Sequence, residues 1–273
     1  MKRTFLIANA IVMLLLAAPV RAQEKVTVPF RSPGMPRTLV IDGMLGNVTV
    51  RAYSGAEALV EMSGAAAKAA RTRSEIPAGM RRIGGSGAAL DIVEMNNEVR
   101  ITGGNMLGKS DVDIQVPAQT SVRIKSVFSG EIRVENMSGE IEVETMNGRV
   151  DIVNASGSVV TNSMNGKVTV SLASVTPDKP MSFSSMNGEI DVTLPATTKA
   201  NLKMKTNRGE IYSDFDVVLT PTARTAETQT TTTTKNGRTV RLRTDGSTNG
   251  TINGGGPDYQ FTTFNGNILL HKK

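Results

Sequence analysis

Acidic and basic side chains recur at regular intervals in the middle of the chain and are the first candidates for chemistry. The carboxylates are Glu131, Glu140, Glu142, Asp151, Glu189 and Asp191, and Arg133 and Arg149 stand beside them. Two carboxylates on one strand face could act as general acid and base on a polysaccharide, or could hold Ca²⁺. The charges repeat together with the surrounding sequence, so a solvated strand face with ion pairs between strands explains them more simply. We therefore predict no catalytic residue among them.

Other reactive groups are scarce. His271, third from the end, is the only histidine, and the chain has no cysteine. A Ser-His-Asp triad needs a well-placed histidine, and a lone histidine near a terminus is more typical of a surface residue. Ser-Lys chemistry stays open, but no motif indicates it. The glycine run 254–256 is not followed by the Gly-Lys-Ser/Thr of a phosphate-binding loop. We predict no enzyme activity and no cofactor.

Methionine and asparagine precede several of the regularly spaced glycines. The methionines are Met137, Met146, Met164 and Met186, and the asparagines are Asn147, Asn165, Asn187 and Asn265. Thioethers are soft ligands, so such a methionine column in an exported protein could bind copper. Methionine also fills irregular gaps in protein cores, which explains the spacing without a metal. We predict core packing for the methionines and no metal site. For the asparagines we predict turn geometry, with hydrogen bonds between successive coils.

The stretch from Ser129 to Val170 is the framework that must position these side chains. Its glycines fall at positions 130, 139, 148, 157 and 166, nine residues apart. The second and fourth residues after most of these glycines are apolar, as in Ile141 and Val143, whereas the first and third are mostly polar. This alternation is typical of strands with one buried face. The fixed short period indicates stacked structural units.

Two all-β folds compete for this pattern. Asn-Gly between alternating segments is a strong hairpin signal and would give an antiparallel meander. A β-solenoid instead stacks equivalent corners in columns. It explains why Met-Asn-Gly recurs at Met146, Met164 and Met186. We predict a β-solenoid of nine-residue strand-turn units, about two units per coil, in which Gly188 and then Gly209 continue the column.

The rest of the chain is assigned around this core. Residues 1–22 have the charged start, the apolar run and the small-residue cleavage site of a secretory signal peptide, which would leave Gln23 at the new N-terminus. Residues 23–128 are predicted to be the N-terminal capping part of the solenoid. Residues 129–273 are predicted to form the regular repeat core and the C-terminal strands of the same domain.

Charge and cysteine content limit the compartment and the partners. Without Lys2, Arg3 and Arg21, 28 of the 31 basic residues remain against 25 acidic ones. This excess is too small to indicate nucleic-acid binding. The lack of cysteine excludes a disulfide framework and a lipoprotein anchor. No later apolar run is long enough to span a bilayer. We expect an exported protein, periplasmic or at the cell surface, with no integral membrane segment after signal cleavage.

Two phrases carry a family resemblance. They are DVDIQVPAQTSVRIKSVFSGEIRVENMSGEIEVETMNGRVDI and GTINGGGPDYQFTTFNGNILL. Over roughly residues 36 to 270 the chain resembles the bacterial putative-adhesin family, a domain of unknown function with β-helix-like repeats. The resemblance implies a right-handed β-helix-like fold in an exported or cell-envelope protein, and it brings no catalytic residues. The Ala-rich segment 64–73, a short helix or an excursion, and the Thr-rich segment 219–235, a solvated loop or edge strand, depart from the family pattern.

These observations favour a non-enzymatic, exported cell-envelope structural or interaction module, adhesin-like in character. The expected partner is an envelope or surface protein, with a glycan as the alternative ligand. Residues 171–180 and 219–235, together with the exposed strand faces, are the candidate contact surfaces. One alternative is a polysaccharide-binding or polysaccharide-cleaving β-helix protein. Another is a periplasmic accessory of an envelope-stress sensing system.

Overall fold

The computed structural model describes residues 25–32, 34–43, 45–64, 89–104, 110–220, 230–234, 237–241 and 247–273. These residues form strands, turns and loops, and none of them is helical. The predicted signal peptide lies outside the described residues. The Ala-rich segment after Gly64 and residues 221–229 of the Thr-rich segment lie outside them as well.

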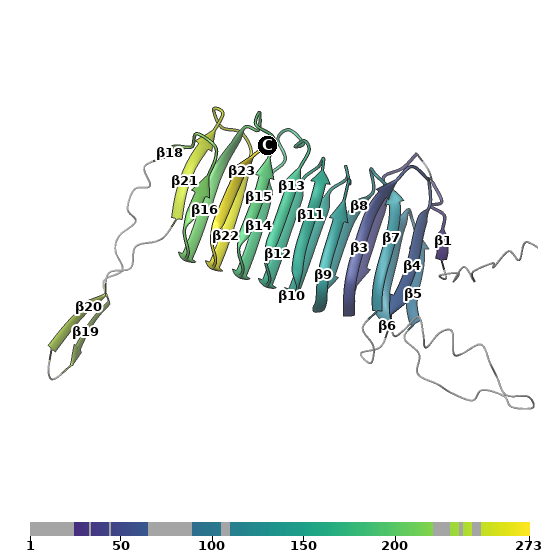
Figure 1. The fold of residues 1–273 in the computed structure, drawn as a ribbon, viewed down its shortest axis with the longest axis horizontal. Helices are drawn as coiled ribbons and strands as arrows, with labels where there is room; N and C mark the ends of the chain where they lie inside the picture. The colour runs from purple at the N-terminus through teal and green to yellow at the C-terminus, as the bar shows by residue number, and fades with distance from the viewer. Residues whose placement is uncertain are drawn as a thin grey trace, which may run out of the picture.

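Two large sheets carry most of the strands, and in Figure 1 both extend along the length of the molecule. Sheet A has ten strands, in the spatial order β1 (Lys25–Val28), β4 (Ala58–Gly64), β7 (Ser110–Pro117), β3 (Leu45–Tyr53), β9 (Phe128–Glu135), β11 (Arg149–Ala155), β13 (Val168–Leu172), β15 (Ile190–Leu194), β23 (Ile268–Lys272) and β17 (Ile211–Ser213).

Sheet B has eleven strands, in the order β18 (Val218–Thr220), β21 (Ser247–Ile252), β16 (Ala200–Arg208), β22 (Asp258–Asn265), β14 (Met181–Asn187), β12 (Val159–Asn165), β10 (Ile141–Asn147), β8 (Ser121–Ser126), β2 (Thr38–Asp42), β6 (Glu98–Gly104) and β5 (Ala89–Met95). Strands β19 (Thr230–Thr234) and β20 (Gly237–Arg241) form a separate antiparallel pair. Part of the Thr-rich segment is therefore a strand.

In the central coils the chain alternates between the two sheets, and each strand pairs in parallel with its equivalent in the next coil. Ile141 of β10 lies opposite Val159 of β12, and Val150 of β11 lies opposite Val168 of β13. A meander would pair these neighbours antiparallel. The prediction of stacked coils is therefore confirmed for this region, and the meander is wrong.

Between the sheets lies one apolar core. The alternation read from the sequence holds, because Ile132 and Val134 of β9 have no exposed surface and Ile141 is 2% exposed. Aromatic side chains enter the core near its C-terminal end, where the rings of Phe183 and Phe261 stack with centroids 5.1 Å apart. Most of the other buried side chains are Val, Ile and Leu, and their burial stabilises the packing of the two sheets.

The coils near both ends do not follow chain order. Strands β2 and β3 come before β6 and β7 in the chain but lie one coil nearer the centre of the stack. Strands β22 and β23 come after β16 and β17 in the chain and also lie one coil nearer the centre. Gly188 donates its N–H to Asn265 at 3.0 Å, and Gly266 donates to Arg208 at 3.1 Å. The predicted direct step from Gly188 to Gly209 is therefore wrong, because Gly266 stands between them.

Antiparallel strands flank the stack at both ends, with β4, β1 and β5 at one end and β21 and β18 at the other (Figure 1). The C-terminal strand β23 pairs with β15 and β17. Strand β23 therefore lies inside sheet A rather than at its edge.

Candidate interaction surface

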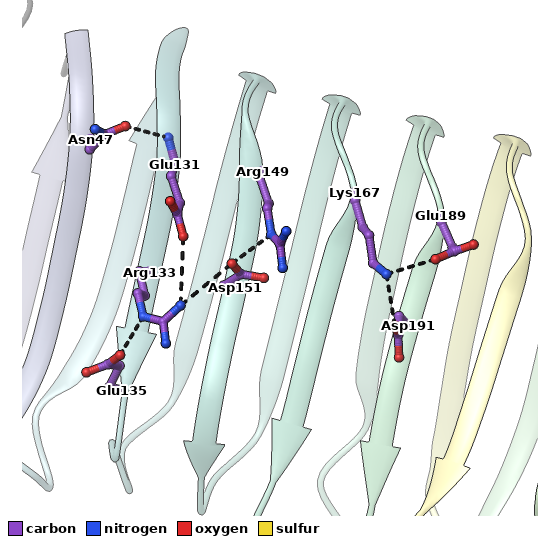
Figure 2. A network of polar contacts seen from close by, with 9 residues as sticks. All are labelled: Asn47, Glu131, Arg133, Glu135, Arg149, Asp151, Lys167, Glu189 and Asp191. Carbon is purple, nitrogen blue, oxygen red and sulfur yellow. Dashed lines mark hydrogen bonds and ion pairs between the residues drawn. The ribbon is translucent and has the colours of Figure 1, made fainter.

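Charged side chains form a ladder on the outer face of sheet A (Figure 2). Arg133 of β9 forms an ion pair with Glu135 of its own strand and lies 3.8 Å from the carboxylate of Asp151 on β11. The Nε of Arg149 lies 2.7 Å from the same carboxylate. Parallel in-register pairing places these side chains in adjacent coils, so the charges meet across strands.

Hydrogen bonding between Arg133 and Glu135 changes the titration of both groups. The hydrogen bond lowers the pKa of Glu135, and the nearby guanidinium charges of Arg133 and Arg51 lower it further. The same hydrogen bond raises the pKa of Arg133. Because Arg51 of β3 also lies 3.1 Å from Glu135, this carboxylate joins two coils.

Lys167, directly before β13, is the centre of a second cluster on sheet A (Figure 2). Its Nζ donates to Glu189 at 2.8 Å and to Asp191 at 3.0 Å, and these two hydrogen bonds raise the pKa of Lys167. His271 of β23 lies 3.7 Å from Asp191 and 2.9 Å from Asp214. Its side chain is 44% exposed, so the chain's one histidine is a surface residue within an ion-pair cluster.

The structure divides the predicted acidic group between the two sheets. Glu142 lies on β10 of sheet B, 3.4 Å from Arg123, and Glu140, directly before that strand, lies 3.1 Å from Lys179. Asp151, on sheet A, was expected to point into solvent but is only 4% exposed. The expected ion pairs between strands are present, but the carboxylates are divided between two outer faces, because the strand from each half of a coil enters a different sheet.

The Met-Asn-Gly corners join the end of a sheet B strand to the next strand of sheet A. The third residue is fixed by backbone contact, because a Cβ atom at Gly166 would lie 2.0 Å from the carbonyl oxygen of Gly148 in the previous coil. Real Cβ atoms do not approach a carbonyl oxygen so closely. Only glycine therefore lets these coils stack at this spacing.

The second residue of the corner forms a hydrogen-bonded ladder. Asn165 donates its side-chain Nδ2 to Oδ1 of Asn147 at 3.1 Å, Asn187 donates to Asn165 at 2.8 Å, and Asn265 donates to Asn187 at 2.7 Å. Stacked asparagine amides of this kind satisfy one another along a column of identical positions. The predicted hydrogen bonds between coils are confirmed.

The first residue of the corner is exposed. Met146, Met164 and Met186 are 44%, 42% and 51% exposed, whereas Met137 is buried and lies outside their strands. The prediction of gap-filling core packing is therefore wrong for these three. Alternation explains the error, because the inward position before each exposed methionine is taken by a hydroxyl residue, as with Ser185, which donates to the carbonyl oxygen of Gly166 at 3.1 Å.

Together with Val127, directly after β8, and Phe264 of β22, these methionines form what we call the apolar column, which runs across sheet B. Its members, in spatial order, are Val127, Met146, Met164, Met186 and Phe264, and each is at least 42% exposed. The guanidinium group of Arg208 lies 5.8 Å from the centre of the Phe264 ring. Exposed apolar residues gathered in one line are more informative than the same residues scattered over a surface.

The outer face of sheet B beside the column is uncharged in its centre. Strands β12, β14 and β22 carry no charged residue from their second position to their last, and β12 and β14 carry none at all. The neighbouring strand β10 carries Glu142 and Glu144, and β16 carries Lys203 and Lys205. The sequence signal for this face is the lack of charged residues in the segments VVTNSMN and MSFSSMN.

Residues 108–253 match the sequence pattern of the Toastrack DUF4097 family. The chain belongs to this family. The family resemblance inferred from sequence is thereby confirmed, and the solenoid-like character of the Toastrack fold agrees with the stacked coils. No curated protein matches the chain in sequence.

Two crystal structures are similar to this Toastrack chain. One is a putative cell adhesion protein from Clostridium sporogenes, with 10% identity and a TM-score of 0.46 over 92% of this chain and 100% of that one. The other is a putative adhesin from Bacteroides fragilis, with 11% identity and a TM-score of 0.40 over 92% of this chain and 98% of that one.

A cavity of about 460 Å³ lies at the opposite corner of this Toastrack chain, against the predicted contact loop 171–180. Thr198 and Tyr259 line it, and their hydroxyl oxygens are buried without a hydrogen-bond partner among the described residues. Burial raises the pKa of Tyr259. The remaining lining residues come from the loops at 173–178, 195–199 and 255–257. The glycine run 254–256 therefore shapes a turn beside this cavity.

Within the part of the chain that the structure describes, no three His, Cys, Asp or Glu side chains come together as they would around a metal ion. Among the same residues there is also no helix with the length and hydropathy of a membrane span.

Proposed function

We propose that this chain is a non-enzymatic interaction module of the cell envelope, adhesin-like in character, and that its partner binds to the outer face of sheet B. The observation that carries the proposal is the apolar column with the uncharged strands β12 and β14 beside it. The favoured partner is an envelope or surface protein, because aromatic and methionine side chains are typical of the centres of protein interfaces.

The contrast with sheet A supports this choice of face. On sheet A the carboxylates of Asp151 and Asp191 contact cations of neighbouring coils. A ligand would have to displace those ion pairs before it could bind there. On sheet B the methionines of the column expose apolar surface that water solvates poorly, so covering them favours binding.

The stacked scaffold supports an interaction role as well. Asn165 and Gly166 hold adjacent corners in register through side-chain and backbone contacts. A partner that binds such a surface does not have to order a flexible loop, so less entropy is lost on association. The finer features of the fold, a right-handed coil and a nine-residue repeat unit, belong to the same proposal, as does export directed by residues 1–22.

Site-specific photo-crosslinking tests the proposed face. p-Benzoylphenylalanine would replace Met164 on sheet B or, as the control, Thr169 on the outer face of sheet A, in intact cells that produce the protein. We expect the same discrete adduct from several independent cultures at position 164 and none at position 169. Adducts of equal yield at both positions, or at neither, would contradict the proposal.

A glycan array run with the mature chain tests the alternative ligand class. We expect no binding to glycans by the wild-type chain. Binding that is lost when Met164 is changed to Lys would keep the face and replace the protein partner by a polysaccharide. Glycan binding that is insensitive to this change would show that the outer face of sheet B is not the binding surface.

A further inference from the structure

Three thioethers stand side by side on consecutive coils of sheet B. The pairings on both sides of each methionine, Thr145 with Ser163 and Asn147 with Asn165, place Met146 directly opposite Met164. The equivalent pairings of β12 with β14 place Met164 opposite Met186. All three side chains are between 42% and 51% exposed, so their sulfur atoms belong to a surface rather than to the core.

The fold does not explain why these positions are methionine. The stacking of the corner depends on Gly166 and on the amide ladder through Asn165. The inward positions before the methionines are filled by Thr145, Ser163 and Ser185, each at most 3% exposed. Any exposed side chain could stand at the first corner position, yet the same thioether occurs there in three successive coils.

We propose that Met146, Met164 and Met186 form a binding site for Cu(I). Thioether sulfur is a soft ligand and selects Cu(I) over the harder divalent ions. Neighbouring parallel strands lie about 4.8 Å apart, and a methionine side chain has three rotatable bonds. Sulfur atoms from adjacent coils can therefore converge on one ion while the backbone stays fixed.

The surroundings of the column suit a singly charged ion held by neutral ligands. Asn162 and Asn165 flank Met164 on its own strand, and β14 beside it carries no charge. The carboxylate of Glu144 next to Met146 lies 3.2 Å from Lys125 and is already paired. Because thioethers carry no proton to lose, the affinity for Cu(I) should not depend on pH, unlike that of sites built from histidine or cysteine.

The metal site goes beyond the proposed partner-binding role and can be separated from it. Leucine in place of methionine keeps the apolar surface that a partner would cover but removes the ligand sulfur. The Met146→Leu, Met164→Leu, Met186→Leu triple variant should therefore lose Cu(I) and keep the photo-crosslinked partner, whereas Met164→Lys should lose both. The Cu(I) site and the partner-binding face can therefore fail independently of each other.

The test is a competition for Cu(I) between the purified mature chain and a chromophoric Cu(I) chelator, without oxygen. We expect the wild-type chain to withdraw Cu(I) from the chelator with the same affinity at about pH 7 and about pH 5. Met164→Leu should bind Cu(I) at least about tenfold more weakly than the wild type, and the triple variant should not compete with the chelator. Met95→Leu, which removes a 63% exposed methionine on β5, is the matched control and should bind like the wild type.

A measurement on the unmutated chain guards against a folding artefact. With the methionine methyl groups labelled with ¹³C, addition of Ag(I) as a redox-stable substitute should shift the signals of Met146, Met164 and Met186 and leave that of Met95 in place. Three results would overturn the proposal. They are no competition by the wild-type chain, equal competition by the triple variant, and binding that is lost on acidification in the range where histidine titrates.

Discussion

The outer faces of sheets A and B follow the same strand alternation but use their exposed positions differently. On sheet A, Arg133, Arg149 and Lys167 bind carboxylates of their own and neighbouring strands. On the central strands of sheet B the equivalent positions are uncharged, and Met164 and its column neighbours remain exposed. The comparison indicates that the outward side chains of sheet A pair with one another and stabilise the fold, whereas those of central sheet B remain available to bind a partner.

The largest expected loss of unfolding free energy comes from a substitution in the core that lies beneath both faces. Ile141 is 2% exposed, so Ile141→Asp places an unpaired carboxylate in the shared core and should cost about 4 kcal/mol or more of unfolding free energy. The side chain of Glu140 is 61% exposed, so Glu140→Lys should change stability by about 0.5 kcal/mol at most. Thermal unfolding of both variants measures the difference, and equal shifts in Tm would contradict the burial pattern.

An intermediate effect separates the two faces directly. Asp151 is nearly buried and forms a 2.7 Å ion pair with Arg149, so Asp151→Asn should cost about 1 kcal/mol. Asn162 lies on the outer face of sheet B and is exposed, so Asn162→Ala should stay within about 0.5 kcal/mol of the wild type. Urea unfolding provides both values. The contrast between the faces fails if Asn162→Ala costs as much as Asp151→Asn.

A smaller effect concerns the acid dependence of sheet A. The pKa of Glu135 is lower in the folded chain than in the unfolded one, chiefly because Arg133 donates a hydrogen bond to it. Its stabilising contribution is complete above the ordinary carboxyl value of 4.5 and is lost as the pH falls through the lower folded value. Glu135→Gln should therefore flatten the loss of unfolding free energy below about pH 4.5. Parallel pH profiles for the variant and the wild type would exclude this role.

Much of the fold could be predicted, because the apolar residues and the corner residues repeat at short, regular intervals in the sequence. The alternation around Ile141 and the recurrence of Met-Asn-Gly led to stacked coils and to the asparagine ladder, and both are present. Strand order at the ends could not be predicted in this way. The placement of Gly266 between Gly188 and Gly209 depends on pairing between segments far apart in the chain, which a local repeat does not encode.

The candidate site was harder to predict, because alternation gives the side to which a residue points but not its surroundings. Asp151 points outward, as expected, yet Arg133 and Arg149 cover it. Met164 was assigned to the core on residue type, although its position in the alternation is outward. Division of the carboxylates between two sheets follows from the turn after each strand, so Glu142 and Asp151 could not be placed from their own segments alone.

The central claim is that, within one Met-Asn-Gly corner, the glycine and the asparagine serve the fold and the methionine serves binding. Urea unfolding of three single variants at consecutive positions tests it most directly. Gly166→Ala should cost about 3 kcal/mol, because its Cβ would meet a carbonyl oxygen at 2.0 Å, whereas Gly34→Ala has no atom within 4 Å and is the control.

In the same series Asn165→Ala should cost about 1 kcal/mol, through the loss of its ladder hydrogen bonds. Met164→Ser should remain within about 0.5 kcal/mol of the wild type, because an exposed side chain without a structural role contributes little. That descending order is the result the account predicts. A cost for Met164→Ser as large as that for Gly166→Ala would make the methionine a structural residue and contradict the account.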